Sequence, residues 1–300
     1  MLAGDKRRIG RGILAIALVV AGLLGFNIII AQAAAVIDTQ LGNTNPTLGG
    51  TDYTPIYHAA NLVSIALITP WSMGLQRWLY GVRGPSLHSV VSRFRFDVFG
   101  RAFLFIGPVW LLISIGGLNF MPVEPTQWSP AGLIAIVATT LLLTPLQAAG
   151  EEYGFRGLVF RVTGSWNRGP RTALVVGVLV SSLVFTVVHF APDPWFNVWC
   201  GALAVSMAVI TWRTGGVETA VVVHALNNTI TFLLLTVLHA DQNAAMERSV
   251  GSGTPFLLLP SATVVAIAAV VWLRTRRTGP ALTPAAPSPV PPHRPEHGTP

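Results

Sequence analysis

Long apolar segments with almost no charge dominate this sequence. A helix needs about 20 apolar residues to cross the roughly 30 Å hydrocarbon layer of a membrane. Eight segments approach that length: 12–36, 58–80, 102–121, 131–161, 172–191, 195–212, 216–238 and 255–273. Only 10% of the residues are charged, against about 25% in soluble domains, so the chain could not cover itself in water. We therefore predict an all-α, polytopic membrane bundle of about eight transmembrane helices in the cell membrane.

Two of these segments are interrupted, and a third could be something else. Pro70 lies inside the second segment and Pro145 inside the fourth. The first follows a basic stretch and ends in AQAAA, which is similar to a secretory signal. Its apolar part is longer than the about 7–15 residues of a cleavable signal. We therefore expect the first segment to remain as an uncleaved helix.

Basic residues orient the predicted bundle, because lysine and arginine concentrate in cytoplasmic loops. If the N-terminus is cytoplasmic, the segments on that side are 1–11, 77–101, 156–171, 213 and 274–300. They contain every lysine and arginine except Arg248. We therefore expect both termini in the cytoplasm. The net charge of +7 is divided among these short clusters, which favours a lipid bilayer as partner and argues against nucleic acid.

Polar residues inside the predicted spans are the exceptions, since each ionised side chain near a helix centre costs about 2.5–3.5 kcal/mol. The fourth span contains GEEYGFRG, with Glu151, Glu152 and Arg156. Glu152 precedes Arg156 by four residues, the favourable order for a helical ion pair. Adjacent helical residues point about 100° apart, so Glu151 faces elsewhere and could act on a water. Alternatively, these charges lie at a solvated helix end.

Two later spans carry histidines. Phe185 and His189 are four residues apart, as are His224 and Asn228, so each pair shares a helical face. Asn227 is expected to point away from the second pair. Taken singly, such residues could be structural, for example by hydrogen bonding between membrane helices. Together with the carboxylates they supply a base for water, an imidazole partner and donors for a developing oxyanion.

In this order and on separate spans, the three motifs resemble those of the CPBP family of intramembrane proteases. This family groups CAAX prenyl proteases with bacteriocin-processing enzymes. Its EExxxR motif appears as Glu151, Glu152 and Arg156, its FxxxH motif as Phe185 and His189, and its HxxxN-type motif as His224 and Asn228. The resemblance covers roughly residues 130–240. Each motif is weak alone, but three in order are fairly specific.

The resemblance implies an intramembrane endopeptidase that hydrolyses peptide bonds of membrane-associated proteins or peptides. By analogy with the family, Glu151 would activate the attacking water, assisted by His189. His224 and Asn228 would stabilise the tetrahedral oxyanion. The second glutamate and the arginine of the first motif would hold the geometry of the site, with Phe185 in support.

Two alternatives stay open at this point, one on metal dependence and one on the function. Glu151, His189 and His224 are an acceptable zinc ligand set, but the HExxH pattern is absent, and we expect no required cofactor. The alternative function is a non-enzymatic membrane protein, either a permease or an immunity-type binding protein. A permease should spread its polar residues along a continuous path, whereas a peptidase should gather them in one pocket.

A difference in depth stands against a single site. At 1.5 Å per residue, His189 lies about 25 Å along its helix from residue 172, whereas His224 lies about 12 Å from residue 216. Straight perpendicular helices would leave the two histidines at different levels. Helix tilt, or a fifth helix that begins below the membrane, would close the gap.

The chain is expected to consist of four parts. These are N-terminal helices and loops at 1–129, a CPBP-like catalytic core at 130–240, an external loop and last helix at 241–273, and a disordered Pro-rich tail at 274–300. The Ala-, Arg- and Pro-rich composition suggests a bacterium with a GC-rich genome.

Overall fold

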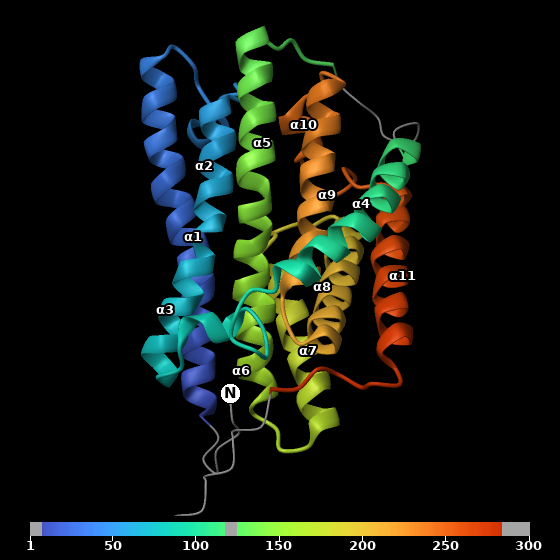
Figure 1. Ribbon diagram of the computed structural model, residues 1–300. Helices are drawn as coiled ribbons and strands as arrows, with labels where there is room; N and C mark the ends of the chain where they lie inside the picture. The colour runs from blue at the N-terminus through green and yellow to red at the C-terminus, as the bar shows by residue number, and fades with distance from the viewer. Residues whose placement is uncertain (1–7, 118–124, 284–300) are drawn as a thin grey trace, which may run out of the picture.

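The computed structural model describes residues 8–117 and 125–283, and their secondary structure is helical without a β-strand (Figure 1). Seven helices in this part of the chain are long and apolar enough to cross a membrane. They are α1 (Ile9–Gln40), α4 (Phe96–Gly117), the continuous α5–η4–α6 (Pro130–Gly164), α7 (Pro170–Val187), α8 (Pro194–Thr214), α9 (Glu218–Val237) and η5–α11 (Pro255–Thr275). The predicted multi-pass helical membrane bundle is therefore confirmed.

The prediction of one continuous second span at 58–80 is wrong. Two helices, α2 (Pro55–Ala66) and α3 (Ile68–Tyr80), meet at Leu67 and lie end to end beside α1 (Figure 1). Pro70 explains the break, because proline has no N–H and its ring clashes with the carbonyl four residues earlier. With 12 and 13 residues, neither helix alone is long enough to cross the bilayer.

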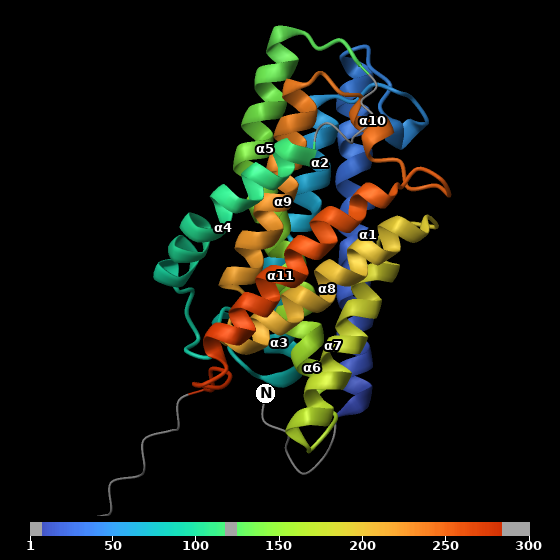
Figure 2. The same ribbon diagram turned by 90° about the vertical axis from the view of Figure 1, so that its right-hand side faces the viewer.

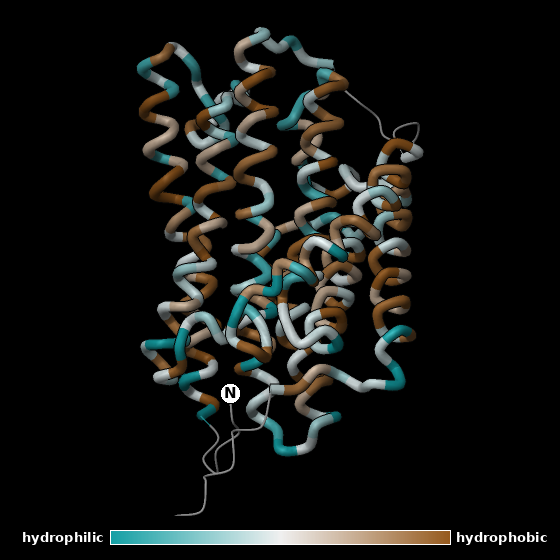
Figure 3. The backbone as a smooth tube through the Cα atoms, viewed as in Figure 1, coloured by the Kyte–Doolittle hydropathy of each residue, from teal (hydrophilic) through white to brown (hydrophobic). Residues whose placement is uncertain are grey.

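Both described chain ends lie at one end of the bundle. Figures 1 and 2 place the start of α1, the end of α11 and the α6–α7 turn at this end, which we call the basal end. The opposite, distal end is formed by the loops 41–54, 125–129 and 238–257, including the short helix α10 (Gln242–Ala245). Figure 3 shows hydrophilic residues at both ends and mostly hydrophobic ones between them, as a membrane-spanning bundle requires.

The central helix begins at the distal end and changes geometry halfway along. Its first part is α5 (Pro130–Glu151), which continues past Pro145. The same helix then becomes π-helical in η4 (Glu152–Val159) and α-helical again in α6 (Phe160–Gly164). On one side α5 touches α2 at backbone distance, since a Cβ added to Gly150 would lie 2.1 Å from the carbonyl oxygen of Ile65. On the other sides α9 and α7 pack against this central helix.

The end of the chain returns along the basal end. Helix α11 (Leu258–Thr275) is followed by a segment whose Ala281 N–H donates a 3.2 Å hydrogen bond to the carbonyl of Arg213. Most of the predicted disordered tail, residues 284–300, lies outside the described residues.

Candidate active site

The π-helical segment carries the first part of the site. Arg156 donates from Nη1 to Oε1 of Glu152 over 3.1 Å, and both side chains are fully buried. The same oxygen accepts a hydrogen bond from Nδ1 of His224, at 2.8 Å, across to α9. The structure thus contains the Glu152–Arg156 pair that the spacing predicted. It adds that Glu152 fixes the ring of His224.

Glu151 lies beside this cluster, near the second nitrogen of the same imidazole. Its Oε2 is 3.6 Å from Nε2 of His224, which is longer than a hydrogen bond. Among the described residues this oxygen has no hydrogen-bond partner. Oε2 of Glu152 likewise has no partner among them, but Oε1 of Glu152 is held by Arg156 and His224. Of the two glutamates, Glu151 is the one that lines the cavity described below.

Gln147 was missed by the sequence analysis and joins two of the predicted residues. Its Nε2 donates to Oε1 of Glu151 over 2.7 Å, and its Oε1 accepts from Nδ2 of Asn228 over 3.0 Å. The available signal was its position one helical turn before Glu151, which places both side chains on one face. Asn228 reaches the carboxylate through this single side chain.

Asn227 was predicted to point away from the site, and this is wrong. Its Nδ2 donates to Oδ1 of Asn228 over 2.8 Å, and both residues line the cavity described below. Two neighbouring side chains that point about 100° apart on a helix can both line a cavity if the cavity is wide. Both amides therefore face the site.

His189 is connected to the rest of the site by contacts of Phe185. Nδ1 of His189 donates to the carbonyl of Phe185 over 2.7 Å, so in the neutral imidazole Nε2 is the free acceptor. The Phe185 ring lies 4.6 Å from the His189 ring and 6.1 Å from that of His224, centroid to centroid. The guanidinium of Arg156 covers this ring at 4.2 Å, a cation–π contact. Within the described residues, His189 makes no hydrogen bond to the predicted site residues on the central helix or on α9.

The expected difference in depth is closed because α7 starts nearer the basal end than α9 does. The turn between α6 and α7 is the lowest part of the described bundle (Figures 1 and 2), so α7 begins well below the start of α9. The long rise of α7 then brings Phe185 against Phe155 of η4, with centroids 5.2 Å apart.

Part of the predicted site lines one cavity of about 920 Å³, whereas Glu152, Arg156 and Phe185 lie behind its wall. At its inner part are Glu151, His189, His224 and Asn228, together with Gln147. From there its lining continues toward the distal end, where it includes Thr51, Tyr53, His58, Asn243 and Arg248. No residue of the basal loops 81–95, 165–169 or 215–217 lines it among the residues described. The cavity therefore faces the distal end.

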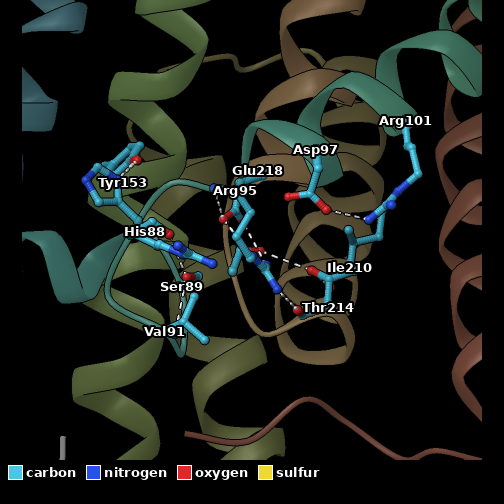
Figure 4. Close-up of polar contacts among 12 residues, drawn as sticks. His88, Ser89, Val91, Arg95, Asp97, Arg101, Tyr153, Ile210, Thr214 and Glu218 are labelled. Atoms are coloured by element: carbon cyan, nitrogen blue, oxygen red, sulfur yellow. Dashed lines mark hydrogen bonds and ion pairs between the residues drawn. The ribbon is translucent and has the colours of Figure 1, made fainter. Parts of the chain in front are cut away.

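A second polar cluster closes the basal side and holds the site elements in place (Figure 4). Arg95 makes a bidentate pair with the buried Glu218 in the first turn of α9, at 2.9 and 2.7 Å. This hydrogen bonding raises the pKa of Arg95. Next to it, His88 is hydrogen-bonded to the hydroxyl of Tyr153, the neighbour of Glu152. The basal loop thus ties α9 and η4 together below the site.

The three suggested metal ligands do not converge on one point. Within the described residues, no group of three or more His, Cys, Asp or Glu side chains is placed to hold a metal ion. Nδ1 of His224 is engaged by Glu152, and Nδ1 of His189 by a backbone carbonyl. Such contacts leave Nε2 of each ring free, as in the histidine ligands of metal sites, so the absence of a required cofactor stays a prediction.

The fold and the site define a class of protein: a multi-pass helical membrane protein in which glutamate, histidine and asparagine side chains line one cavity. Residues 130–230 match the family model described as type II CAAX prenyl endopeptidase Rce1-like. This segment contains every motif position named above, so the resemblance to the CPBP intramembrane proteases is confirmed over it.

A second comparison matches a longer stretch of the chain. The uncharacterized protein YyaK of Bacillus subtilis is 29% identical over 146 aligned residues, and the match covers 45% of this chain and 47% of YyaK. The chain thus spans about half the length of this curated relative. No solved structure matches the chain.

Proposed function

We propose that the protein is an intramembrane endopeptidase of the cell membrane that hydrolyses peptide bonds of membrane-associated proteins or peptides. The observation that carries this proposal is the environment of Glu151. One carboxylate oxygen is held by Gln147, and the other is unpaired in a cavity that also contains two histidines and Asn228. A positioned carboxylate with a free oxygen suits a general base for water.

In the proposed reaction, Oε2 of Glu151 takes a proton from a water while the water oxygen attacks the peptide carbonyl carbon. His189 assists by accepting a hydrogen bond from that water at Nε2. The carbonyl oxygen becomes an oxyanion, and the proton held by Glu151 then passes to the departing amide nitrogen as the C–N bond breaks. The products are a carboxylate and an amine.

Asn228 and His224 are proposed to stabilise the oxyanion. Asn228 donates one Nδ2 proton to Gln147, which leaves the second for the substrate. For His224 to donate from Nε2, its ring must carry a proton on both nitrogens, because Nδ1 faces Glu152. The two glutamates would balance the charge of that imidazolium. Removing one such donor costs about 10²–10³ in rate.

A permease is less well supported by the arrangement of the polar residues. A conducting path would need polar groups from one face of the membrane to the other. The cavity reaches only the distal end, and the Arg95–Glu218 pair and the neighbouring loop contacts close the basal side. Polar groups gathered in one pocket are the arrangement expected for a peptidase.

The test is the substitution Glu151→Gln in cells, followed by proteomic comparison of membrane-protein termini with the wild type. We expect termini generated by the protein to disappear, with the variant present at wild-type levels. Asp97→Asn, which removes a carboxylate from an exposed ion pair far from the cavity, is the matched control and should leave the termini unchanged. Identical termini in the Glu151→Gln and wild-type cells would contradict the proposal.

A further inference from the structure

Arg248 departs from the charge pattern of the rest of the chain. It is the only lysine or arginine outside the segments predicted to be cytoplasmic. It lies in the loop between α10 and α11 at the distal end (Figure 2). Basic residues are disfavoured in short loops on that side of a membrane. We therefore expect a local interaction of the Arg248 side chain to explain a cation at this position.

Among the half-buried and buried arginines of the described chain, Arg248 is the one whose guanidinium makes no hydrogen bond or ion pair. Its side chain is half-buried and lies 5.3 Å from the Phe196 ring centroid. Within the described residues, no carboxylate lies within 4.0 Å of it and no hydrogen bond leaves its guanidinium. The other half-buried or buried arginines of the described chain all donate to an oxygen: Arg95, Arg156, Arg161 and Arg213.

The neighbouring acid does not neutralise this cation. Oε1 of Glu247 accepts from the backbone N–H groups of Arg248 and Ser249, at 2.8 and 2.7 Å. The carboxylate is thus turned toward the backbone of its own loop. Glu247 and Arg248 both line the cavity that contains Glu151 and His189. Of this pair, the guanidinium is the group that makes no hydrogen bond within the described residues.

The loop that carries Arg248 is fastened to the turn that carries His189. The carbonyl of Arg248 accepts the N–H of Asp193 at 3.3 Å, and Oδ2 of Asp193 accepts the N–H of Gly251 at 2.9 Å. The other oxygen of Asp193 caps α8 through the N–H of Trp195 at 2.8 Å. The spacing between the cation and the catalytic histidine is therefore set by backbone contacts rather than by a free loop.

We propose that Arg248 binds a carboxylate of the peptide substrate and so positions the scissile bond over Glu151 and His189. A planar guanidinium with free N–H groups recognises a carboxylate in a bidentate manner. The carboxylate is either the C-terminal group of the substrate or an Asp or Glu side chain. Because the cavity faces the distal end, the substrate segment reaches the site from that end. This inference rests on the proposed function.

The probes that test it are three sets of fluorescent peptides with the same randomised apolar core. The first has a free C-terminal carboxylate and no acidic side chain, the second has an amidated C-terminus and one Glu, and the third has an amidated C-terminus and Gln in place of Glu. Binding is measured by anisotropy to full-length protein in lipid nanodiscs. The protein carries Glu151→Gln, so that binding is separated from turnover.

We expect one of the two carboxylate sets to bind about 10- to 100-fold more tightly than the amidated Gln set, as suits a charge-assisted pair. Arg248→Gln should abolish that preference, and Arg248→Lys should retain part of it. Arg101→Gln, which removes an exposed arginine from the basal end, should retain all of it. Whichever set is preferred identifies the source of the carboxylate.

Two outcomes would overturn the inference. One is equal binding of the three peptide sets, or an equal loss for all three in Arg248→Gln. The other is loss of co-purified anionic phospholipid in Arg248→Gln with peptide binding unchanged, which would assign the cation to a lipid headgroup. Cleavage of the same peptides by protein with Glu151 intact tests the proposed function separately. Carboxylate-dependent binding without cleavage would contradict the peptidase and keep the role of Arg248.

Discussion

Gln147 donates a hydrogen bond from Nε2 to Oε1 of Glu151 over 2.7 Å. Through its own carbonyl oxygen it also holds Asn228 at 3.0 Å. A single amide therefore sets the distance between the proposed base and a proposed oxyanion donor.

Gln147→Met should lower kcat about 10- to 100-fold, because it removes one buried and one half-buried hydrogen bond and leaves their partners unsatisfied. KM should change little, since Gln147 holds the catalytic groups rather than the peptide. The measurement is steady-state cleavage of a quenched peptide by purified protein. Thr144→Val, one turn away in α5, removes a buried hydroxyl that has no hydrogen-bond partner in the described part of the chain and should leave kcat unchanged. Equal rates for both variants would contradict the role given to Gln147.

The positions of the membrane helices could be predicted because their signal is local. Apolar length and basic flanks located α1, α7 and α8 within a few residues. Pro70 marked a break, but the resulting helix pair was predicted as one span. A proline removes a hydrogen bond wherever it occurs, but neighbouring packing decides whether the helix ends there, and α5 continues past Pro145.

The catalytic residues could be proposed from the sequence, but their connections could not. The i,i+4 spacing predicted the Glu152–Arg156 pair because both residues lie on one helix. The contact of Glu152 with His224 joins residues 72 positions apart, and no helical period reports on such a distance. Gln147 was missed for a related reason: a lone glutamine in an apolar span is recognisable as functional only when Asn228 is known to face it.

Gly150 should tolerate no side chain. A Cβ there would lie 2.1 Å from the carbonyl oxygen of Ile65, and that atom belongs to a backbone that cannot move aside. Gly150→Ala should therefore destabilise the protein by about 1–3 kcal/mol through overpacking, and displace the adjacent Glu151. Thermal unfolding in detergent measures the effect. Gly201→Ala in α8 meets no atom within 4 Å and should be neutral or stabilising by about 0.5–1 kcal/mol. A stable Gly150→Ala variant would refute the close contact of α2 with α5.

The ion pairs Arg95–Glu218 and Asp97–Arg101 have the same length, 2.7 Å, and opposite burial. The side chain of Glu218 is fully buried, whereas both partners of the second pair are about two-thirds exposed. Glu218→Gln leaves Arg95 without its buried counter-charge and should cost about 3–5 kcal/mol. Asp97→Asn should cost at most about 1 kcal/mol. Unfolding by denaturant in mixed micelles compares the two, and equal losses would contradict the anchoring role of Glu218.

Activity should survive removal of metal ions. The described residues contain no group of three His, Cys, Asp or Glu side chains placed to hold a metal ion. We therefore expect substoichiometric zinc by elemental analysis of the purified protein, and unchanged peptide cleavage after treatment with a chelator. Stoichiometric zinc whose removal abolishes cleavage, and whose return restores it, would replace the metal-free mechanism with a zinc-dependent one.

Acid should release the loop that carries Arg248. Burial by itself raises the pKa of Asp193, but hydrogen bonds from four backbone N–H groups outweigh it and hold the pKa below its ordinary value near 3.8. These donors belong to Trp195, Phe196, Gly251 and Gly253. Because the folded pKa is the lower one, the stabilisation is complete above about pH 4 and disappears as the pH falls through the folded value. Hydrogen exchange at residues 248–253, corrected for intrinsic rates, should therefore accelerate below about pH 4.

Glu247 titrates in the same loop and must be separated from Asp193. Hydrogen bonds from the N–H groups of Ser249 and Arg248 lower its pKa as well, so its contribution has the same sign. Asp193→Asn should make exchange at Gly251 fast already at neutral pH and remove most of its acid response. Glu247→Gln should affect mainly Arg248 and Ser249, whose N–H groups it accepts. If both substitutions left the acid response of Gly251 intact, Asp193 would not be the group that fastens this loop to the turn after His189. The fixed spacing between Arg248 and the site would then lack its physical basis.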